Sequence, residues 1–173
     1  MAEGVLVRRL YAGDLRAYKV LRDAMLEGHP AAFTSDAQTE GHRRADDYLP
    51  RLGLERASDG QLLLGAWQGT SLLGAIGLER DMRTKVRHIG HVIGMMVSDA
   101  AQGHGIGRML LDSLIEEARG PAGLEMLTLT VTDGNASAVR LYERSGFMQF
   151  GMLQRAIRVG DRYHDKIYMV KSL

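Results

Sequence analysis

Cysteine is absent from the 173 residues of this sequence, and its absence removes three classes of chemistry at once. Without a thiol, the chain cannot carry a disulfide framework, a thiolate metal site or a cysteine nucleophile. Long apolar runs are also missing, since no stretch approaches the roughly 20 residues of a membrane span. The first residues lack the charged start and long apolar core of a signal peptide. We therefore expect a cytoplasmic protein with no membrane partner.

An excess of charge of either sign is missing as well. The sequence has 22 Lys and Arg against 21 Asp and Glu, which gives a formal net charge of +1. This balance lacks the electrostatic signature of a nucleic-acid-binding protein or of one attracted to an acidic membrane surface, so we expect neither partner. The length fits a single domain over residues 1–173, without internal repeats or linkers.

What the sequence does contain is a glycine-rich turn, V-S-D-A-A-Q-G-H-G-I-G, over residues 97–107. The apolar run Ile93–Val97 before it predicts a strand, and apolar residues at helical spacing after it predict a helix that begins near Gly107. Glycines allow the backbone to approach an anion, and the free N–H groups of a helix start favour pyrophosphate. A dinucleotide fingerprint would need Gly or Ala at Arg108, and a P-loop would need a Gly-Lys-Ser/Thr triplet that the sequence lacks.

A second block, N-A-S-A-V-R-L-Y-E-R-S-G-F, covers residues 135–147 and follows a strand-like run, Leu127–Val131. Asn135 is placed to cap a helix start, and Gly146 is placed at its C-terminal end. Together, Gln102-x-x-Gly105-x-Gly107 and this second block resemble the two ordered motifs of the GNAT superfamily of acetyl-CoA-dependent N-acetyltransferases. The resemblance is specific over residues 89–147.

The resemblance implies an α/β (α+β) fold, in which helices cover both faces of a mixed, mostly antiparallel sheet of about seven strands with one parallel crossover. The strands predicted from the pattern are Val5–Val7, Leu62–Trp67, Leu72–Leu78, Val86–Val97, Leu127–Val131, Met148–Val159 and Tyr163–Val170. The predicted helices are Asp14–Gly28, Asp36–Arg44, Asp46–Leu54, Gly107–Arg119 and Asn135–Ser145, and Pro50 argues against joining the second and third.

The activity that the resemblance implies is acetyl transfer from acetyl-CoA to a primary amine, by direct attack and through a tetrahedral intermediate. The residues that match the family's cofactor-binding positions are Met95, Met96, Val97, Gln102, Gly103, His104, Gly105, Ile106, Gly107, Arg108, Asn135 and Tyr142. The three strand residues are expected to act through their backbone. No metal is expected, because the spacing of His88 and His91 puts them on opposite faces of a strand.

Tyr142 matches the family's general acid, since a phenol stays protonated at neutral pH and can donate to a departing thiolate. The general base is open between His91, Glu79 and a chain of water molecules. His91 lies on the predicted strand before the glycine turn, and imidazole titrates near neutral pH. If that strand is regular, one face carries His91, Ile93, Met95 and Val97, whereas a bulge would break this pattern.

The expected acceptor is a small-molecule amine, with a protein N-terminus or lysine as the alternative. The resemblance places the acceptor pocket near residues 25–44 and 156–165, where Glu27, His29 and Phe33 are candidate lining residues. A regulatory module that binds CoA without turnover is the rival from another class. An α/β hydrolase or a nucleotide enzyme would need a motif that the sequence lacks. A homodimer is compatible with the sequence.

Overall fold

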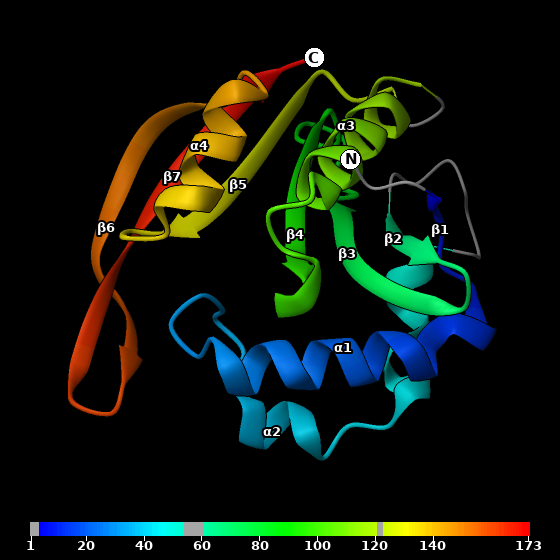
Figure 1. Ribbon diagram of the computed structural model, residues 1–173. Coiled ribbons are helices and arrows are strands. Elements are labelled where there is room, and N and C mark those ends of the chain that lie inside the picture. The colour runs from blue at the N-terminus through cyan, green and yellow to red at the C-terminus, as the bar shows by residue number, and fades with distance from the viewer. Residues whose placement is uncertain (1–3, 54–60, 121–122) are drawn as a thin grey trace.

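The computed structural model describes residues 4–53, 61–120 and 123–173, which form a seven-stranded sheet with flanking helices (Figure 1). The strands are β1 Val5–Arg9, β2 Leu62–Gln68, β3 Ser71–Arg80, β4 Ile89–Val97, β5 Met126–Thr132, β6 Met148–Val159 and β7 Arg162–Ser172. They lie in the order β1-β2-β3-β4-β5-β7-β6, and only β4 and β5 are parallel neighbours among them. The predicted mixed sheet with one parallel crossover is confirmed.

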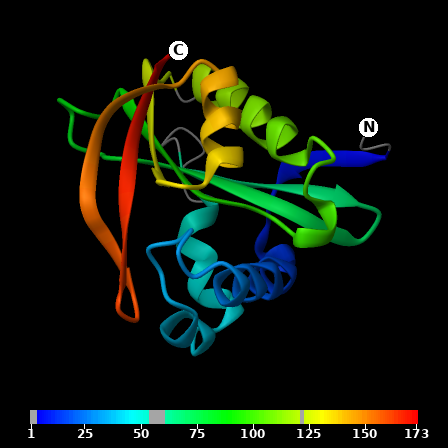
Figure 2. The same ribbon diagram turned by 60° about the vertical axis from the view of Figure 1, so that its left-hand side comes forward.

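Helices cover both faces of this sheet (Figure 2). On one face, called the α1 face here, lie α1 Leu15–Gly28, α2 Ala37–Gly41 and the 3-10 helix η2 Ala45–Leu52. On the other, the α3 face, lie α3 Ile106–Arg119 and α4 Ala136–Arg144. Two short 3-10 turns, η1 Ala12–Asp14 and η4 Asp99–Ala101, precede α1 and α3.

Two apolar clusters fill the spaces between the sheet and its helices. On the α3 face, Leu110 and Leu114 of α3 pack with Leu127 of β5, and all three are fully buried. On the α1 face, Leu15 and Tyr18 pack against Leu63 of β2 and its neighbours. Burial of each leucine side chain contributes roughly 1.5–3 kcal/mol, so these clusters hold the helices on the sheet.

Three predicted elements differ from the structure at their ends. The β4 strand begins at Ile89, because residues 86–88 belong to a turn in which the Ile89 N–H donates to the Val86 carbonyl (3.0 Å). The helix predicted from Asp36 is only the short α2, which Asp36 caps by accepting from the Thr39 N–H (2.8 Å). The helix predicted from Asp46 is the 3-10 helix η2, with Pro50 inside it. Its predicted last residue, 54, lies outside the described residues.

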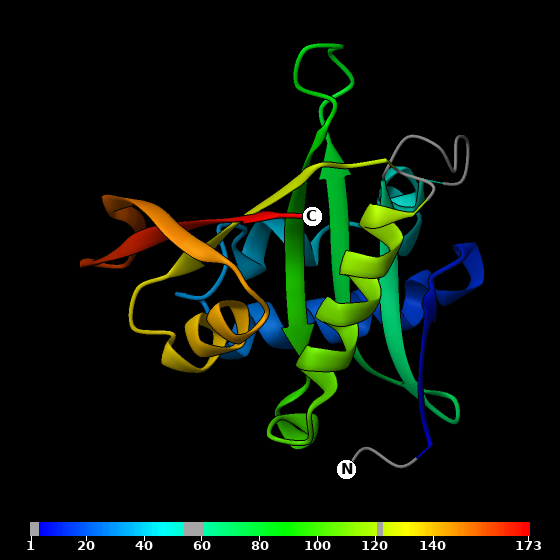
Figure 3. The same ribbon diagram turned by 90° about the horizontal axis from the view of Figure 1, so that it is seen from above.

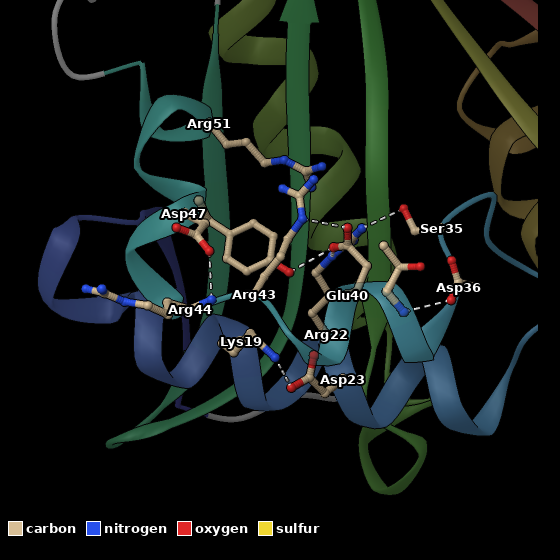
Figure 4. A network of polar contacts seen from close by, with 12 residues as sticks. Lys19, Arg22, Asp23, Ser35, Asp36, Glu40, Arg43, Arg44, Asp47 and Arg51 are labelled. Atoms are coloured by element: carbon tan, nitrogen blue, oxygen red, sulfur yellow. Dashed lines mark hydrogen bonds and ion pairs between the residues drawn. The ribbon is translucent and has the colours of Figure 1, made fainter.

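A buried ionic network ties α1, α2 and η2 together (Figure 4). Arg22 of α1 and Glu40 of α2 are 3% and 5% exposed, and the Arg22 Nε donates to Glu40 Oε2 (2.8 Å). The Tyr48 hydroxyl of η2 donates to the same oxygen (2.8 Å), and Arg43 lies 3.1 Å from the other. Arg22 also donates to the Ser35 hydroxyl (3.0 Å). One carboxylate therefore joins all three helices.

The hydrogen bonds onto Glu40 set the ionisation state of the network. Burial raises the pKa of Glu40, but the hydrogen bonds from Arg22 and Tyr48 outweigh burial, so this pKa lies below its ordinary value. Burial, with the hydrogen bond to Glu40, raises the pKa of Tyr48 to about 12. At neutral pH the network therefore contains an ionised carboxylate and a neutral phenol.

Removing the shared carboxylate should destabilise the protein strongly. Glu40→Ala leaves the Arg22 guanidinium buried without its counter-ion, and we expect the free energy of unfolding to fall by about 3–5 kcal/mol. Urea denaturation measures this loss. Asp46→Ala is the control, because Asp46 forms an exposed ion pair with Arg44 (3.4 Å) and its loss should change stability little. Equal effects of the two substitutions would contradict the structural role assigned to Glu40.

Candidate active site

The glycine-rich turn between β4 and α3 has the geometry expected of an anion site. Gly103 and Gly105 have φ of 78° and 81°, in the left-handed region, and Gly105 is the N-cap of α3. A Cβ built on either would have nothing within 4 Å, so the space above the turn is open. The first N–H groups of a helix have no intrahelical acceptor and lie at its positive end. This turn can therefore hold a phosphate group by its backbone.

The side chains around the turn are engaged elsewhere. Gln102 Nε2 donates to the Val97 carbonyl (3.2 Å) and to Asp99 Oδ1 (2.9 Å), which folds Gln102 back over the end of β4. Arg108 Nε donates to Asp112 Oδ2 (2.6 Å), one turn along α3. His104 is exposed at the tip of the turn. A phosphate contact by Gln102 or Arg108 would thus have to compete with these partners.

Two other turn residues serve packing. Ile106 is buried, and a Cβ on Gly107 would lie 3.1 Å from Met95 Cε and 3.3 Å from Leu141 Cδ2. The absence of a side chain at Gly107 lets the start of α3 approach β4 and α4 closely. This contact brings the glycine turn next to the helix that carries Tyr142.

The parallel strands β4 and β5 diverge beside this turn (Figures 1 and 3). They pair only at Ile89 with Met126, Gly90 with Leu127 and His91 with Thr128, although β4 continues to residue 97 and β5 to residue 132. Beyond the last pair, the two strands no longer satisfy each other's backbone groups. An exposed stretch of backbone donors and acceptors is the arrangement that an extended amide-containing ligand can bind.

A bulge in β4 overturns the regular alternation of its side chains. Met96 is opposite Ala75 and Ile93 is opposite Gly77, so Gly94 and Met95 together face the single residue Ile76. Before the bulge, Ile93 lies on the α1 face, near Leu63. After the bulge, Met95 and Val97 pack against the apolar cluster on the α3 face, and Met96 belongs to the cluster on the α1 face. His91 therefore lies on the face opposite Met95 and Val97, so the alternative named from the sequence, a bulge that breaks the regular pattern, is the one that the structure has.

Tyr142 lies on α4 with its hydroxyl directed at β4. The side chain is 6% exposed, and its hydroxyl donates to Met95 Sδ (3.4 Å). Its ring meets Phe147 edge to face, with 5.9 Å between centroids. Burial raises the pKa of Tyr142 to about 12, so the hydroxyl keeps its proton across the physiological range. The phenol is therefore a fixed, neutral donor beside the divergence of β4 and β5.

Asn135 has the capping role that the sequence predicts. Its Oδ1 accepts from the Ala138 N–H (3.2 Å) and from the Ser137 hydroxyl (3.1 Å) at the start of α4. The cap uses the side-chain carbonyl, so the amide N–H groups of Asn135 are left for other contacts. Cap and ligand contact are therefore compatible.

The two candidate bases lie together on the α1 face. Glu79 of β3 is opposite His91 of β4, and His91 precedes the bulge. His91 is hydrogen-bonded through Nδ1 to Thr128 Oγ1 (2.6 Å), across the last pair that β4 and β5 form. Since Tyr142 is on the α3 face, the sheet separates the candidate acid from both candidate bases at the point where β4 and β5 part.

The segment between α1 and α2 bridges the divergent strand ends, which sequence reasoning did not foresee. His29 Nε2 pairs with Asp99 Oδ1 (2.7 Å) just after β4, and the Thr132 hydroxyl at the end of β5 donates to the Ala31 carbonyl (2.7 Å). Phe33, another predicted lining residue, instead packs half-buried against the α1 cluster. Glu27 is exposed on α1. These contacts join residues far apart in sequence, so no local pattern indicated them.

The structure offers no obvious metal centre in the part of the chain it describes. Across residues 4–53, 61–120 and 123–173, His, Asp and Glu side chains do not gather in a group of three that could hold an ion. His88 belongs to the turn before β4 rather than to the strand, so the predicted argument from opposite strand faces does not apply to it. Among the same residues, no helix is long and apolar enough to cross a membrane.

Comparison with known proteins gives a consistent picture. The model of the acetyltransferase (GNAT) family matches residues 21–147. The chain is 38% identical over 117 residues to the N-alpha-acetyltransferase RimI of Mycobacterium tuberculosis, covering 66% of this chain and 70% of that protein. It is 33% identical over 149 residues to the mycothiol acetyltransferase of Geodermatophilus obscurus, covering 85% of this chain and 46% of that protein. The chain thus spans about half the length of that relative.

A solved structure shares the fold over nearly the whole chain. A GNAT superfamily phosphinothricin acetyltransferase of Sinorhizobium meliloti, in complex with acetyl-CoA, superposes with a TM-score of 0.84. The match covers 98% of this chain and 89% of that one, at 18% identity. At that identity the likeness concerns the fold, and it agrees with the sheet order described above.

The glycine turn gives a test of the anion site that separates binding from backbone strain. Gly105→Ala puts a methyl group into the open space above the turn, at a φ that costs alanine about 1–2 kcal/mol. We expect the affinity for coenzyme A, measured by calorimetry, to fall at least about tenfold. Gly123→Ala is the matched control, because Gly123 also has positive φ (58°) and open space around it, but precedes β5. Unchanged affinity in both folded variants would contradict the site.

Proposed function

The chain belongs to the acetyltransferase (GNAT) family, and from this premise we propose that it transfers the acetyl group of acetyl-CoA to the primary amine of a small molecule. The observation that carries the proposal is the divergence of β4 and β5, with an open glycine turn and a helix start at its end. Tyr142 approaches this gap from the α3 face, and His91 with Glu79 lies on the α1 face. A donor and an acceptor can thus meet from opposite sides of the sheet.

In this proposal, backbone groups make most of the contacts to acetyl-CoA, the acetyl donor. Acetyl-CoA supplies an activated acyl group, a thioester, when bound. The N–H groups that follow Gly105 hold its pyrophosphate at the positive end of α3. The backbone of Met95, Met96 and Val97, which β5 does not pair, binds the amide arm and offers an N–H to the carbonyl oxygen as negative charge develops there. The free amide N–H groups of Asn135 add a further contact.

Tyr142 acts as the proton donor to the departing sulfur. The pKa of Tyr142 is raised to about 12, above that of an ordinary thiol, so the hydroxyl gives up its proton only as negative charge builds on the departing sulfur. The hydroxyl therefore acts first as a hydrogen-bond donor, strengthened by its dry surroundings as charge builds on sulfur. The hydrogen bond to Met95 Sδ supports this role, because it shows the hydroxyl directed at a sulfur atom next to the gap.

His91 or Glu79 removes the proton from the acceptor amine. An alkylamine is mostly protonated at neutral pH, and only the neutral form attacks a thioester. His91 is exposed and held by Thr128, so it can receive a proton and release it to solvent. Glu79, opposite His91, is the second candidate, and a water chain past both residues is the third.

A peptide N-terminus is the second acceptor class to consider, because the Mycobacterium tuberculosis relative is an N-alpha-acetyltransferase. Release of free CoA from acetyl-CoA, measured with pooled small amines and with a set of peptides, decides between them. We expect release with small amines. Thermal stabilisation by acetyl-CoA without release in any pool would instead indicate a regulatory module that binds CoA without turnover.

Removing the Tyr142 hydroxyl tests whether Tyr142 donates the proton to the departing sulfur. Tyr142→Phe keeps the buried ring and removes the donor, so we expect kcat to fall by about 10²-fold or more while the KM for acetyl-CoA changes little. Tyr11→Phe serves as the control, since Tyr11 is an exposed phenol before α1. A Tyr142→Phe enzyme with wild-type kcat would reduce Tyr142 to a packing residue.

The pH profile of kcat/KM identifies the base. An imidazole base makes the rate rise across the neutral range, whereas a carboxylate base has finished titrating below it. We expect His91→Gln to remove the rise and to slow turnover at pH 7 more than at pH 9, where more amine is already neutral. Glu79→Gln is the paired variant. If only Glu79→Gln loses the rise of kcat/KM with pH, Glu79 is the base. If the pH profile of kcat/KM is unchanged in both variants, water removes the proton.

A further inference from the structure

Lys166 of β7 is a half-buried cation without an acidic partner on the α1 face. Its Nζ donates to Thr34 Oγ1 (2.5 Å) and lies 3.4 Å from Thr130 Oγ1 of β5. Among the residues that the structure describes, Lys166 forms no ion pair with a carboxylate. Burial lowers the pKa of Lys166, in line with its reduced contact with water. Hydrogen bonds to neutral hydroxyl groups make up only part of the solvation that a half-buried ammonium group loses. An anionic group of a ligand beside Lys166 would therefore be stabilised.

The neighbouring segment adds charge of the same sign. Ser35, next to Thr34, accepts a hydrogen bond from Arg22, which belongs to the buried network (Figure 4). Around the Tyr48 ring in that network, Arg22, Arg43 and Arg51 lie within 6.0 Å of the ring centroid. Arg22 and Arg43 pair with Glu40, whereas Arg51 donates to the Tyr18 hydroxyl (3.4 Å), so with Glu40 and the neighbouring Asp36 counted the three guanidinium groups still leave an excess of positive charge. The surroundings of Thr34 and Ser35 therefore favour an anion and disfavour a second ammonium group.

Lys166 of β7 and His91 of β4 both contact threonine side chains of β5, the strand that lies between them. Thr128, the partner of His91, and Thr130, the neighbour of Lys166, lie two residues apart on the α1 face of β5. Two residues along a strand span about 7 Å. The two threonines thus hold His91 and Lys166 on the same face of the sheet, where one small molecule can contact the imidazole with its amine and the ammonium with an anionic group.

We propose that the acceptor carries a carboxylate beside its amine, as an α-amino acid does, and that Lys166 binds this carboxylate. The inference rests on the proposed function, because it names the acceptor of the same transfer. With the carboxylate on Lys166, the amine lies toward His91 and the gap between β4 and β5. A polyamine would bring a second cation to a positively charged face. A peptide N-terminus has an amide in place of the carboxylate and would leave Lys166 unpaired.

Matched acceptors test the carboxylate directly. We would measure kcat/KM for a panel of amino acids, each beside its amide and its decarboxylated amine, so that the side chain stays constant while the anionic group is removed. The wild-type enzyme should prefer the acid to both analogues by at least about tenfold. In Lys166→Gln, kcat/KM for the acid should fall by at least about tenfold, mainly through KM for the acceptor, with the amide nearly unaffected. Lys166→Arg, which keeps the charge, should restore part of the preference.

Lys171→Gln provides the matched control. Lys171 is a half-buried lysine on the same strand, but it faces the groove between α3 and α4 on the opposite side of the sheet. Its substitution should leave the preference for acids at the wild-type level. If the active wild-type enzyme acetylates amides or amines with the same kcat/KM as the acids, this inference is overturned and the proposed function stays intact. Equal effects of Lys166→Gln and Lys171→Gln on the preference for acids would have the same consequence. No CoA release with any amine or peptide would overturn both.

Discussion

The parallel pairing of β4 with β5 ends after three residue pairs, and the candidate site depends on this interruption. Backbone N–H and C=O groups in a sheet interior normally find partners in the neighbouring strand. Past His91 and Thr128 the two strands no longer pair with each other, and backbone groups of this stretch can bind a ligand, although the Val97 carbonyl already accepts from Gln102. The bulge at Gly94 and Met95 bends β4 away, and the segment after α1 contacts the chain just beyond both strand ends, through Asp99 and Thr132. The gap is thus held open by contacts on the α1 face.

The two faces of the sheet supply different chemistry to this gap. The α3 face is largely apolar beside the gap and carries the buried hydroxyl of Tyr142, whose surroundings keep it neutral. The α1 face carries exposed and half-buried polar groups along β5, which are Thr128, Thr130 and their partners His91 and Lys166. Because the sheet lies between them, a leaving group and an attacking amine can be served at the same moment without sharing a site. In the proposed reaction, the fold would therefore separate proton donation from proton removal.

The buried charges beneath the α1 face have an energetic cost that packing alone does not explain. Well-packed apolar residues usually stabilise a core at least as well as a buried ion pair of similar volume. Here Arg22, Glu40 and Tyr48 are nearly inaccessible, and additional guanidinium groups make the network positive overall. The network joins α2 to α1 and holds Ser35 through Arg22, while the adjacent Thr34 contacts Lys166 of the sheet. The same charge that costs stability thus sets the sign of the field where an acceptor would bind.

The sequence alone determined the features that depend on neighbouring residues. The strand, glycine turn and helix over residues 93–119, the Asn135 cap and the single parallel crossover were all predicted and are confirmed, because periodicity, capping and positive φ are local properties of the chain. Tertiary structure decided the rest. The β4 bulge, which puts His91 and Met95 on opposite faces of the sheet, is defined by the pairing of β4 with β3. The Gln102 side chain donates to the Val97 carbonyl, a contact that the sequence did not indicate. Lys166 meets Thr34 across 132 positions of sequence, and a contact over such a distance is set by how the elements pack, which no short pattern encodes.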